Sequence, residues 1–336
     1  MVKVLLRFLC FILIFSCLSC PVFAKENEIC DNINSLFEYL DKNTNKTEAN
    51  NMADWYYLCC ARVGKDENYN EYAKKIKQSE FNTPTDYQRV VLCLSAIDEK
   101  SDVNNLLEKG IYNNEDIEKQ GINALSYGLI ALDCKRYKVP KSAKYSRPKL
   151  IDLVLSYQNK DGGFSLNGGV SEVDSTAFAL QALAPYKSAK KQKEIALNYL
   201  SKNQAADAGF GSAESVSQVI IALCELKIDC EQDKRFIKNH NTLISNLNKY
   251  KNKNGGFKHI IDQKKSDNLA STQALCALIA HYRFKNNYNL FYDFSNGREN
   301  IIKNETNYFY LVIIACFAAV ICAILIKRRV KNEHYQ

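Results

Sequence analysis

The stretch Gln158–Leu183, QNKDGGFSLNGGVSEVDSTAFALQAL, decides the fold because versions of it return twice further along the chain. Its leading half, QNKDGGF at 158–164, reappears as QAADAGF at 204–210 and as KNKNGGF at 251–257. Its trailing half, STAFALQAL, reappears as SVSQVIIAL at 215–223 and as ASTQALCAL at 270–278. A spacing of about 46 residues is typical of stacked helical hairpins, so the sequence predicts a helical repeat protein.

Each copy has the same physical organisation. A first helix ends near the Gln, and the Asp/Asn-Gly turn that follows uses glycine for the positive φ angles of a tight reversal. The Phe is expected to hold the loop against the core. A second helix rich in alanine and serine then begins, and its small residues predict close packing and burial. The candidate N-caps of these second helices are Asp174 or Ser175, then Ser215, and then Asp267 or Ser271.

The loop Gln-x-x-Asp-Gly-Gly-Phe followed by Ser-Thr-Ala-x-Ala-Leu-Gln-Ala-Leu resembles the prenyltransferase and squalene-oxidase repeat. This repeat belongs to the terpenoid cyclase and protein prenyltransferase superfamily. The resemblance implies an all-α fold, the α/α toroid, with three clear copies over residues 147–284. It does not imply one chemistry, because the same toroid serves in cyclases, in non-enzymatic binding proteins and in thioester-containing domains.

Apolar spacing predicts three more helical pairs before the clear copies. The pairs are Ile29–Leu40 with Ala49–Val63, Glu67–Lys77 with Thr85–Ile97, and Val103–Lys109 with Gln120–Leu132. Ala131-Leu132 aligns with Ala182-Leu183, which marks the third pair as a diverged copy. Six hairpins would close the toroid, so we expect Ala270–Tyr282 to pack beside Ala49–Val63. Closure matters because one hairpin cannot cover its own apolar face.

The two ends of the chain predict export and anchoring. Residues 1–24 have the basic start, apolar run and small final residue of a signal peptide, with lipid attachment at Cys17 as an alternative. Residues 308–326 are uncharged and long enough to span a bilayer, and the basic tail at 327–336 is expected in the cytoplasm. The toroid, residues 25–284, would then lie outside the cell on a stalk at 285–307. This predicts a single-pass protein of the cell membrane.

Charge and cysteine placement exclude other classes. The net charge is +8, but Lys3, Arg7 and four basic residues after 326 contribute much of it, so no nucleic-acid partner is expected. Five of the 13 cysteines lie in the predicted signal and membrane segments. The remaining eight are interpreted first as buried thiols, and a disulfide that involves Cys224, Cys230 or Cys30 is the alternative.

Glu172-Val-Asp174-Ser175-Thr-Ala is the sharpest catalytic candidate. It is similar to the Asp-x-Asp-Asp-Thr-Ala motif of class II terpenoid cyclases, and the resemblance would make Asp174 the general acid. Glu172 and Ser175 replace two of the three carboxylates of that motif. The structural interpretation of Asp174, which we favour, is a helix N-cap. No metal or other cofactor is predicted, because His240, His259 and His281 lack the Cys/His spacing of a zinc site.

A binding function makes fewer demands on the sequence. Side chains of the inner helices and loops are expected to surround a central depression of the ring. The candidates for its lining are Phe164, Phe178, Gln181, Gln218, Phe257 and Gln273. Their amides could orient a ligand or could join adjacent inner helices. We therefore predict a non-catalytic surface module that binds a small apolar ligand or an extracellular protein or peptide. The alternatives are a class II cyclase-like isomerase that uses Asp174 and a purely structural surface protein.

Overall fold

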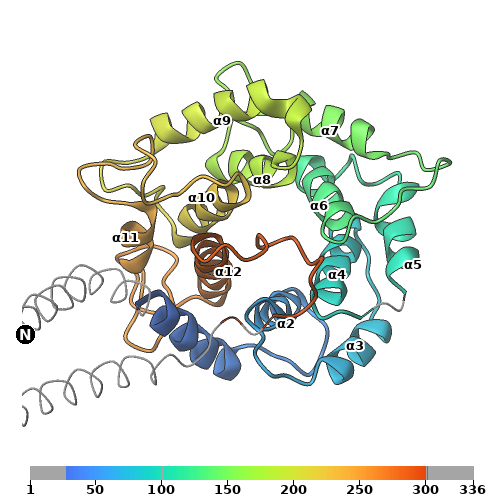
Figure 1. Ribbon diagram of the computed structural model, residues 1–336, viewed down its shortest axis with the longest axis horizontal. Helices are drawn as coiled ribbons and strands as arrows, with labels where there is room; N and C mark the ends of the chain where they lie inside the picture. The colour runs from blue at the N-terminus through green and yellow to red at the C-terminus, as the bar shows by residue number, and fades with distance from the viewer. Residues whose placement is uncertain (1–27, 100–101, 300, 302–336) are drawn as a thin grey trace, which may run out of the picture. The chain divides into compact units, whose positions relative to one another are not determined.

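The computed structural model describes residues 28–99, 102–299 and 301, and its regular structure in this part of the chain is helical (Figure 1). The inner helices are α2 (Asn51–Val63), α4 (Pro84–Ala96), α6 (Gly121–Asp133), α8 (Val173–Leu183), α10 (Ala213–Glu225) and α12 (Asn268–Lys285). The outer elements are the helix at 28–43, α3 (Tyr69–Lys77), α5 (Val103–Leu107) with the π-helical turn Glu108–Tyr112, α7 (Arg147–Ser156), α9 (Lys190–Asn203), preceded by a 3-10 turn (Lys187–Ala189), and α11 (Leu243–Asn248).

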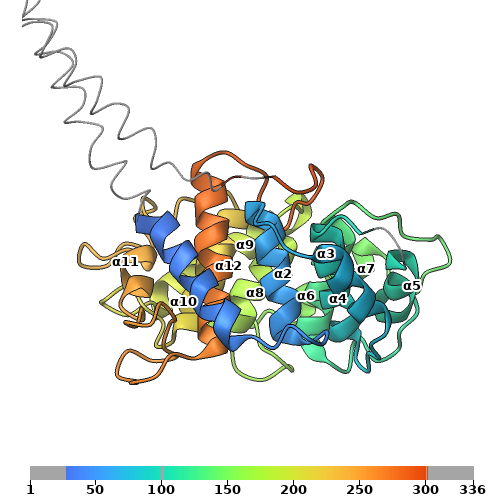
Figure 2. The same ribbon diagram turned by 90° about the horizontal axis from the view of Figure 1, so that it is seen from below.

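The inner helices form a closed ring. Each contacts the next in chain order, and α12 returns to contact α2 (Figures 1 and 2). This confirms the predicted α/α toroid and the predicted closure of its last inner helix on its first. The inner helices are apolar on most sides because two inner neighbours and an outer helix cover each of them, which leaves Leu180, Ile220 and Leu275 fully buried.

The Asp/Asn-Gly loops are built alike in the three clear copies. The Oδ1 atoms of Asp161, Asp207 and Asn254 accept the N–H of the residue two positions on, at 3.0, 3.0 and 3.2 Å. In each loop, the residue between this acceptor and this donor has a positive φ angle, which Gly162 and Gly255 adopt freely. A Cβ atom on Gly255 would lie 2.7 Å from the carbonyl oxygen of Ser35, on the helix at 28–43. The third loop therefore packs against the first outer helix and closes the outer layer.

The N-caps differ from the prediction in two copies. Helix α8 begins at Val173 with Glu172 at the N-cap position, so Asp174 lies in its first turn and is not the cap. The cause is the backbone bond from Glu172 N–H to the carbonyl of Phe164 (2.9 Å), which ends the extended loop at residue 172. Ser212, not Ser215, caps α10. Asp267 caps α12 as predicted and accepts the Ala270 N–H at 2.9 Å.

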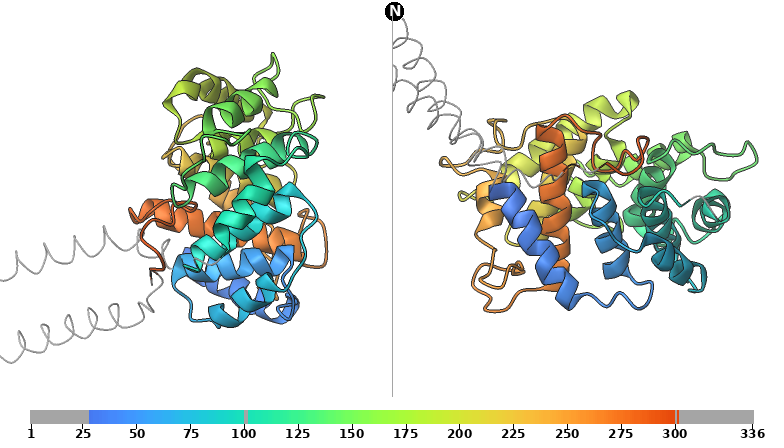
Figure 3. Two further views of the ribbon diagram at one scale, coloured as in Figure 1. Left: turned by 90° about the vertical axis from the view of Figure 1, so that its right-hand side faces the viewer. Right: turned by 60° about the horizontal axis from the view of Figure 1, so that its bottom comes forward.

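The segment 286–299, which follows α12, crosses the face of the ring at the C-terminal ends of the inner helices (Figures 1 and 3). Phe291 and Phe294 are fully buried in it. The guanidinium of Arg62 donates to the carbonyl of Leu290 (2.8 Å), and that of Arg283 donates to the carbonyl of Asn289 (2.7 Å). The segment 286–299 belongs to the stretch 285–307 that was predicted as a stalk. In the structure this segment packs on the toroid instead.

Several expectations concern other parts of the chain. The predicted signal peptide (1–24), membrane helix (308–326) and tail (327–336) lie outside the described residues. Among the residues that the structure does describe, no helix combines the length and apolar character needed to cross a membrane.

Candidate functional site

The bore of the toroid has a hollow at the N-terminal ends of its inner helices, which we call the N-terminal depression. Its volume is about 310 Å³, at the lower end of the usual range for ligand pockets. Side chains of α6, α8, α10 and α12 and of the loop before α8 surround it. The lining residues are Asn123, Tyr127, Leu166, Glu172, Asp174, Ser175, Phe178, Gln218 and Gln273.

An aromatic pair forms the apolar part of the N-terminal depression. The rings of Phe178 on α8 and Tyr127 on α6 meet at 4.4 Å between centroids, and Trp55 on α2 lies 6.3 Å from Tyr127. Phe178 was predicted as a lining residue, and Tyr127 was missed. The signal for Tyr127 was present, because the alignment of Ala131 with Ala182 places Tyr127 at the repeat position of Phe178.

Two carboxylates stand at the mouth of this depression. Glu172 and Asp174 are both exposed, and the Ser175 hydroxyl donates to the Glu172 carboxylate at 2.8 Å. Partial burial raises the pKa of Asp174 and the charge of Glu172 raises it further, whereas a hydrogen bond with the Ser215 side chain lowers it. The nine residues that line the depression include no lysine, arginine or histidine. The acidic pair therefore has no cation beside it in the lining.

The three predicted glutamines form a chain across the bore. Gln181 Nε2 donates to Gln218 Oε1 (2.7 Å) and to the Gln218 carbonyl (3.0 Å), and Gln218 Nε2 donates to Gln273 Oε1 (3.2 Å). The Tyr292 hydroxyl, from the segment 286–299, donates to Gln181 Oε1 at 3.2 Å. The amides thus join α8, α10 and α12. This agrees with the prediction that they join adjacent inner helices. Gln218 and Gln273 also line the N-terminal depression, whereas Gln181 does not.

A second hollow, of about 460 Å³, lies on the C-terminal side of Gln181 and Tyr292. Glu225, at the end of α10, accepts the Tyr292 N–H at 3.2 Å there. Burial raises the pKa of Glu225 to about 7, although backbone hydrogen bonds and the charge of Arg62 oppose the rise. The segment 286–299 contributes Leu290, Tyr292 and Asp293 to this hollow, so it covers the bore on this side.

A comparison with protein families identifies the fold. The model of the prenyltransferase alpha-alpha toroid domain matches residues 105–238 and 185–308, which together span more than half of the 336 residues. The chain belongs to the prenyltransferase α/α toroid domain family. A search among curated proteins found no relative that matches it. Family membership establishes the toroid and leaves the chemistry to be argued from the side chains.

Two predicted lining residues have a different role in this toroid. Phe164 and Phe257 are fully buried and do not line the N-terminal depression. The Phe164 N–H donates to Thr176 Oγ1 and the Phe257 N–H donates to Ser271 Oγ, both at 2.8 Å. The prediction that they line the depression is corrected, because these bonds turn each Phe into the core between the loop and its inner helix.

The histidines of the described residues do not line the N-terminal depression. In the described residues, no three His, Cys, Asp or Glu side chains are grouped so as to hold a metal ion. His259 lies 2.9 Å from Glu214, and His281 is buried with Nε2 3.2 Å from Glu231.

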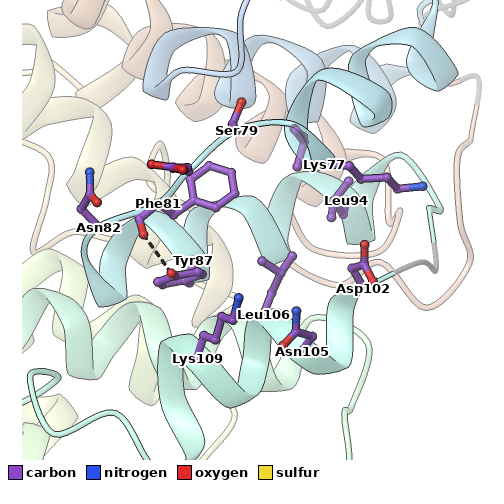
Figure 4. A pocket seen from close by; sticks show the side chains of 12 residues that line it. Lys77, Ser79, Phe81, Asn82, Tyr87, Leu94, Asp102, Asn105, Leu106 and Lys109 are labelled. Carbon is purple, nitrogen blue, oxygen red and sulfur yellow. Dashed lines mark hydrogen bonds between the residues drawn. The ribbon is translucent and has the colours of Figure 1, made fainter.

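A third hollow, of about 370 Å³, lies in the outer layer between α3, α4 and α5 (Figure 4). Its wall includes the Tyr87 hydroxyl, which donates to the Phe81 carbonyl at 2.8 Å.

Proposed function

We propose that this toroid is a non-catalytic binding module whose N-terminal depression receives a positively charged group on an apolar stem. A basic side chain of a peptide and a small alkylamine both have this chemistry. The observation that carries the proposal is that Glu172 and Asp174 line the same depression as the aromatic pair Tyr127 and Phe178, and that this lining includes no lysine, arginine or histidine.

The electrostatics favour a cation over a neutral or anionic group. Burial is the main cause of the raised pKa of Asp174, and repulsion between its carboxylate and that of Glu172 raises this pKa further. A bound ammonium or guanidinium would remove this repulsion. The same cation would gain from the faces of Tyr127 and Phe178, since a cation near an aromatic face is stabilised by about 0.5–2 kcal/mol. An apolar stem would cover the rings, and the amide oxygens of Gln218 and Gln273 offer further acceptors.

The alternative is a cyclase-like isomerase in which Asp174 protonates an alkene. Such an acid has to be held protonated in an enclosed apolar cavity, because water would intercept a carbocation. Here the Asp174 side chain is exposed, and the depression of about 310 Å³ is lined by amides and a second carboxylate. These features favour binding over protonation chemistry. With the predicted signal and membrane segments, the proposal places the module at the cell surface, where a peptide or amine ligand would come from outside.

The single tryptophan makes the test direct. Trp55 lies 6.3 Å from Tyr127, so its fluorescence should report on ligands that enter the N-terminal depression. The purified chain would be titrated with n-butylamine, with a lysine-containing tripeptide and with the norleucine tripeptide as the neutral match. We expect the cationic probes to bind at least about tenfold more tightly than the neutral one, which corresponds to about 1.4 kcal/mol. Their binding should weaken with added salt.

Variants locate the binding and separate the two functions. Asp174→Asn and Glu172→Gln should each weaken binding of the cationic probes by about tenfold. The control Asp152→Asn, exposed on the outer helix α7, should bind as the wild type does. Equal affinity for the lysine and norleucine tripeptides would contradict the proposal. Turnover of a polyprenyl substrate that Asp174→Asn abolishes, with the far-ultraviolet circular dichroism unchanged, would instead support the isomerase.

A further inference from the structure

Two cysteine thiols meet at the place where the ring closes. Cys59 lies on α2, the first inner helix, and Cys276 lies on α12, the last. Their Sγ atoms are 3.4 Å apart, although the residues are 217 positions apart in the chain. Both side chains are buried, and both are free thiols. The contact therefore joins the two ends of the ring through side chains that can form a covalent bond.

We propose that Cys59 and Cys276 are a modification site, at which a small-molecule disulfide such as glutathione disulfide oxidises the two thiols to a disulfide that locks the ring. One thiolate attacks a sulfur of the oxidant, which forms a mixed disulfide and releases one thiol. The second cysteine then attacks the protein sulfur of the mixed disulfide, and the other thiol leaves. The pair loses two electrons and two protons, and the oxidant becomes two thiols. The inference does not depend on the proposed ligand.

The geometry allows the bond with little movement. A disulfide requires its sulfurs to be about 2.05 Å apart, so the two Sγ atoms must together move by about 1.4 Å. Because α2 and α12 are packed neighbours, rotation of the two short side chains can supply that movement without separating the helices. The bond would enclose a loop of more than 200 residues, and long loops gain most from a cross-link in the chain-entropy description.

Burial determines when the bond can form. Burial raises the pKa of the Cys59 thiol well above its usual range, and the neighbouring Cys276 raises it further, so the closed ring contains almost no reactive thiolate at this position. The reaction therefore belongs to folding, before α12 has closed on α2. Once formed, the disulfide would be shielded from reductants by the same burial.

The neighbouring Cys60 is a matched control. It is also buried, and it follows Cys59 directly in α2. Successive residues of a helix point about 100° apart, and the Cys60 thiol lies beside the Tyr56 side chain. A disulfide that depends on the contact between α2 and α12 should use Cys59 and not Cys60.

The test is to refold the full chain with glutathione and glutathione disulfide, and to map it by mass spectrometry without reduction. We expect the tryptic peptides 47–62 and 266–283 to be joined, with a mass about 2 Da below their sum. Cys60→Ala should keep the link, and Cys59→Ala and Cys276→Ala should abolish it. The melting temperature of the oxidised wild type should exceed that of the reduced chain by about 4–7 °C, a difference that Cys59→Ala removes.

The mapping of the wild-type chain decides the question even if an alanine variant folds poorly, and Cys59→Ser offers a second way to remove the thiol. An oxidised, folded wild type without the link between the two peptides would overturn the inference. A link that persists in Cys59→Ala would do the same, because it would assign the bond to Cys60.

Discussion

The closure of the outer layer rests on Gly255, and replacing it with alanine tests that contact. Gly255 has a φ of +86°, and an added Cβ would lie 2.7 Å from the carbonyl oxygen of Ser35. The substitution thus combines two costs. An L-residue in the left-handed region costs about 1–2 kcal/mol, and overpacking against main chain costs about 1–3 kcal/mol more. We expect Gly255→Ala to lower the free energy of unfolding by about 2–5 kcal/mol.

Two glycines of another loop separate these costs. Gly168 has a φ of +81° and no atom within 4 Å of an added Cβ, so Gly168→Ala carries the strain without the clash. Gly169 also has open space and has no positive φ, so Gly169→Ala should leave stability unchanged or raise it slightly. An unfolding entropy of about 2.1 cal/mol/K per residue over about 270 residues gives a shift of about 2 °C per kcal/mol.

The assay is thermal unfolding followed by circular dichroism at 222 nm. The expected falls in melting temperature are about 4–9 °C for Gly255→Ala, about 2–4 °C for Gly168→Ala and less than about 1 °C for Gly169→Ala. If Gly255→Ala and Gly168→Ala have the same melting temperature, the third loop is not in close contact with the helix at 28–43. That result would refute this account of how the outer layer closes.

Three further predictions concern the segment 286–299 and the C-terminal hollow. The pKa of Glu225 is raised from 4.5 to about 7, so its contribution to stability is complete below pH 4.5 and is lost as the pH rises to about 7. Glu225→Gln should therefore gain up to about 3 kcal/mol relative to the wild type between pH 5 and 8, measured by urea unfolding. Tyr292→Phe leaves the buried side-chain oxygen Oε1 of Gln181 without the Tyr292 hydroxyl and should cost about 1 kcal/mol in the same assay. Arg283→Leu removes guanidinium bonds to three partners and should expose 286–299 to limited proteolysis; unchanged cleavage would contradict this role.

Most of the fold could be predicted from the sequence because its signals are local. The Asp/Asn-Gly loops and the alanine-rich helices recur at a fixed spacing, and each feature has a cause within a few residues. Closure followed from the number of hairpins. The segment 286–299 could not be anticipated in the same way, because its polar composition indicates a linker. One of the bonds that hold it on the toroid comes from Arg62, which is far away in the chain. The cap of α8 was misplaced because a backbone bond to Phe164, and not a side chain, sets where that helix begins.

The site was predicted only where the repeat register was informative. Phe178, Gln218 and Gln273 share one register position and do meet at the N-terminal depression, and the same register leads to Tyr127. Phe164 was predicted to line the depression because it is a prominent residue of the motif. In the structure its ring is buried, and it packs the loop against the core, as the ring of Phe257 does in the third copy. A motif residue that every loop needs for folding is therefore a poor guide to what the ring binds.

On the proposed function, the register position four residues before the Ala-Leu pair determines which ligand the ring receives. Tyr127, Phe178, Gln218 and Gln273 occupy this position on four inner helices, and all four side chains line the N-terminal depression. Their neighbours along each helix are buried against other helices, so substitution there disturbs packing. Substitution at the shared position changes the lining, and at Gln218 or Gln273 it also removes amide bonds that join α8, α10 and α12. Two aromatic rings and two amides on this ring, with carboxylates only at the mouth, favour a ligand whose stem is apolar and whose end is charged.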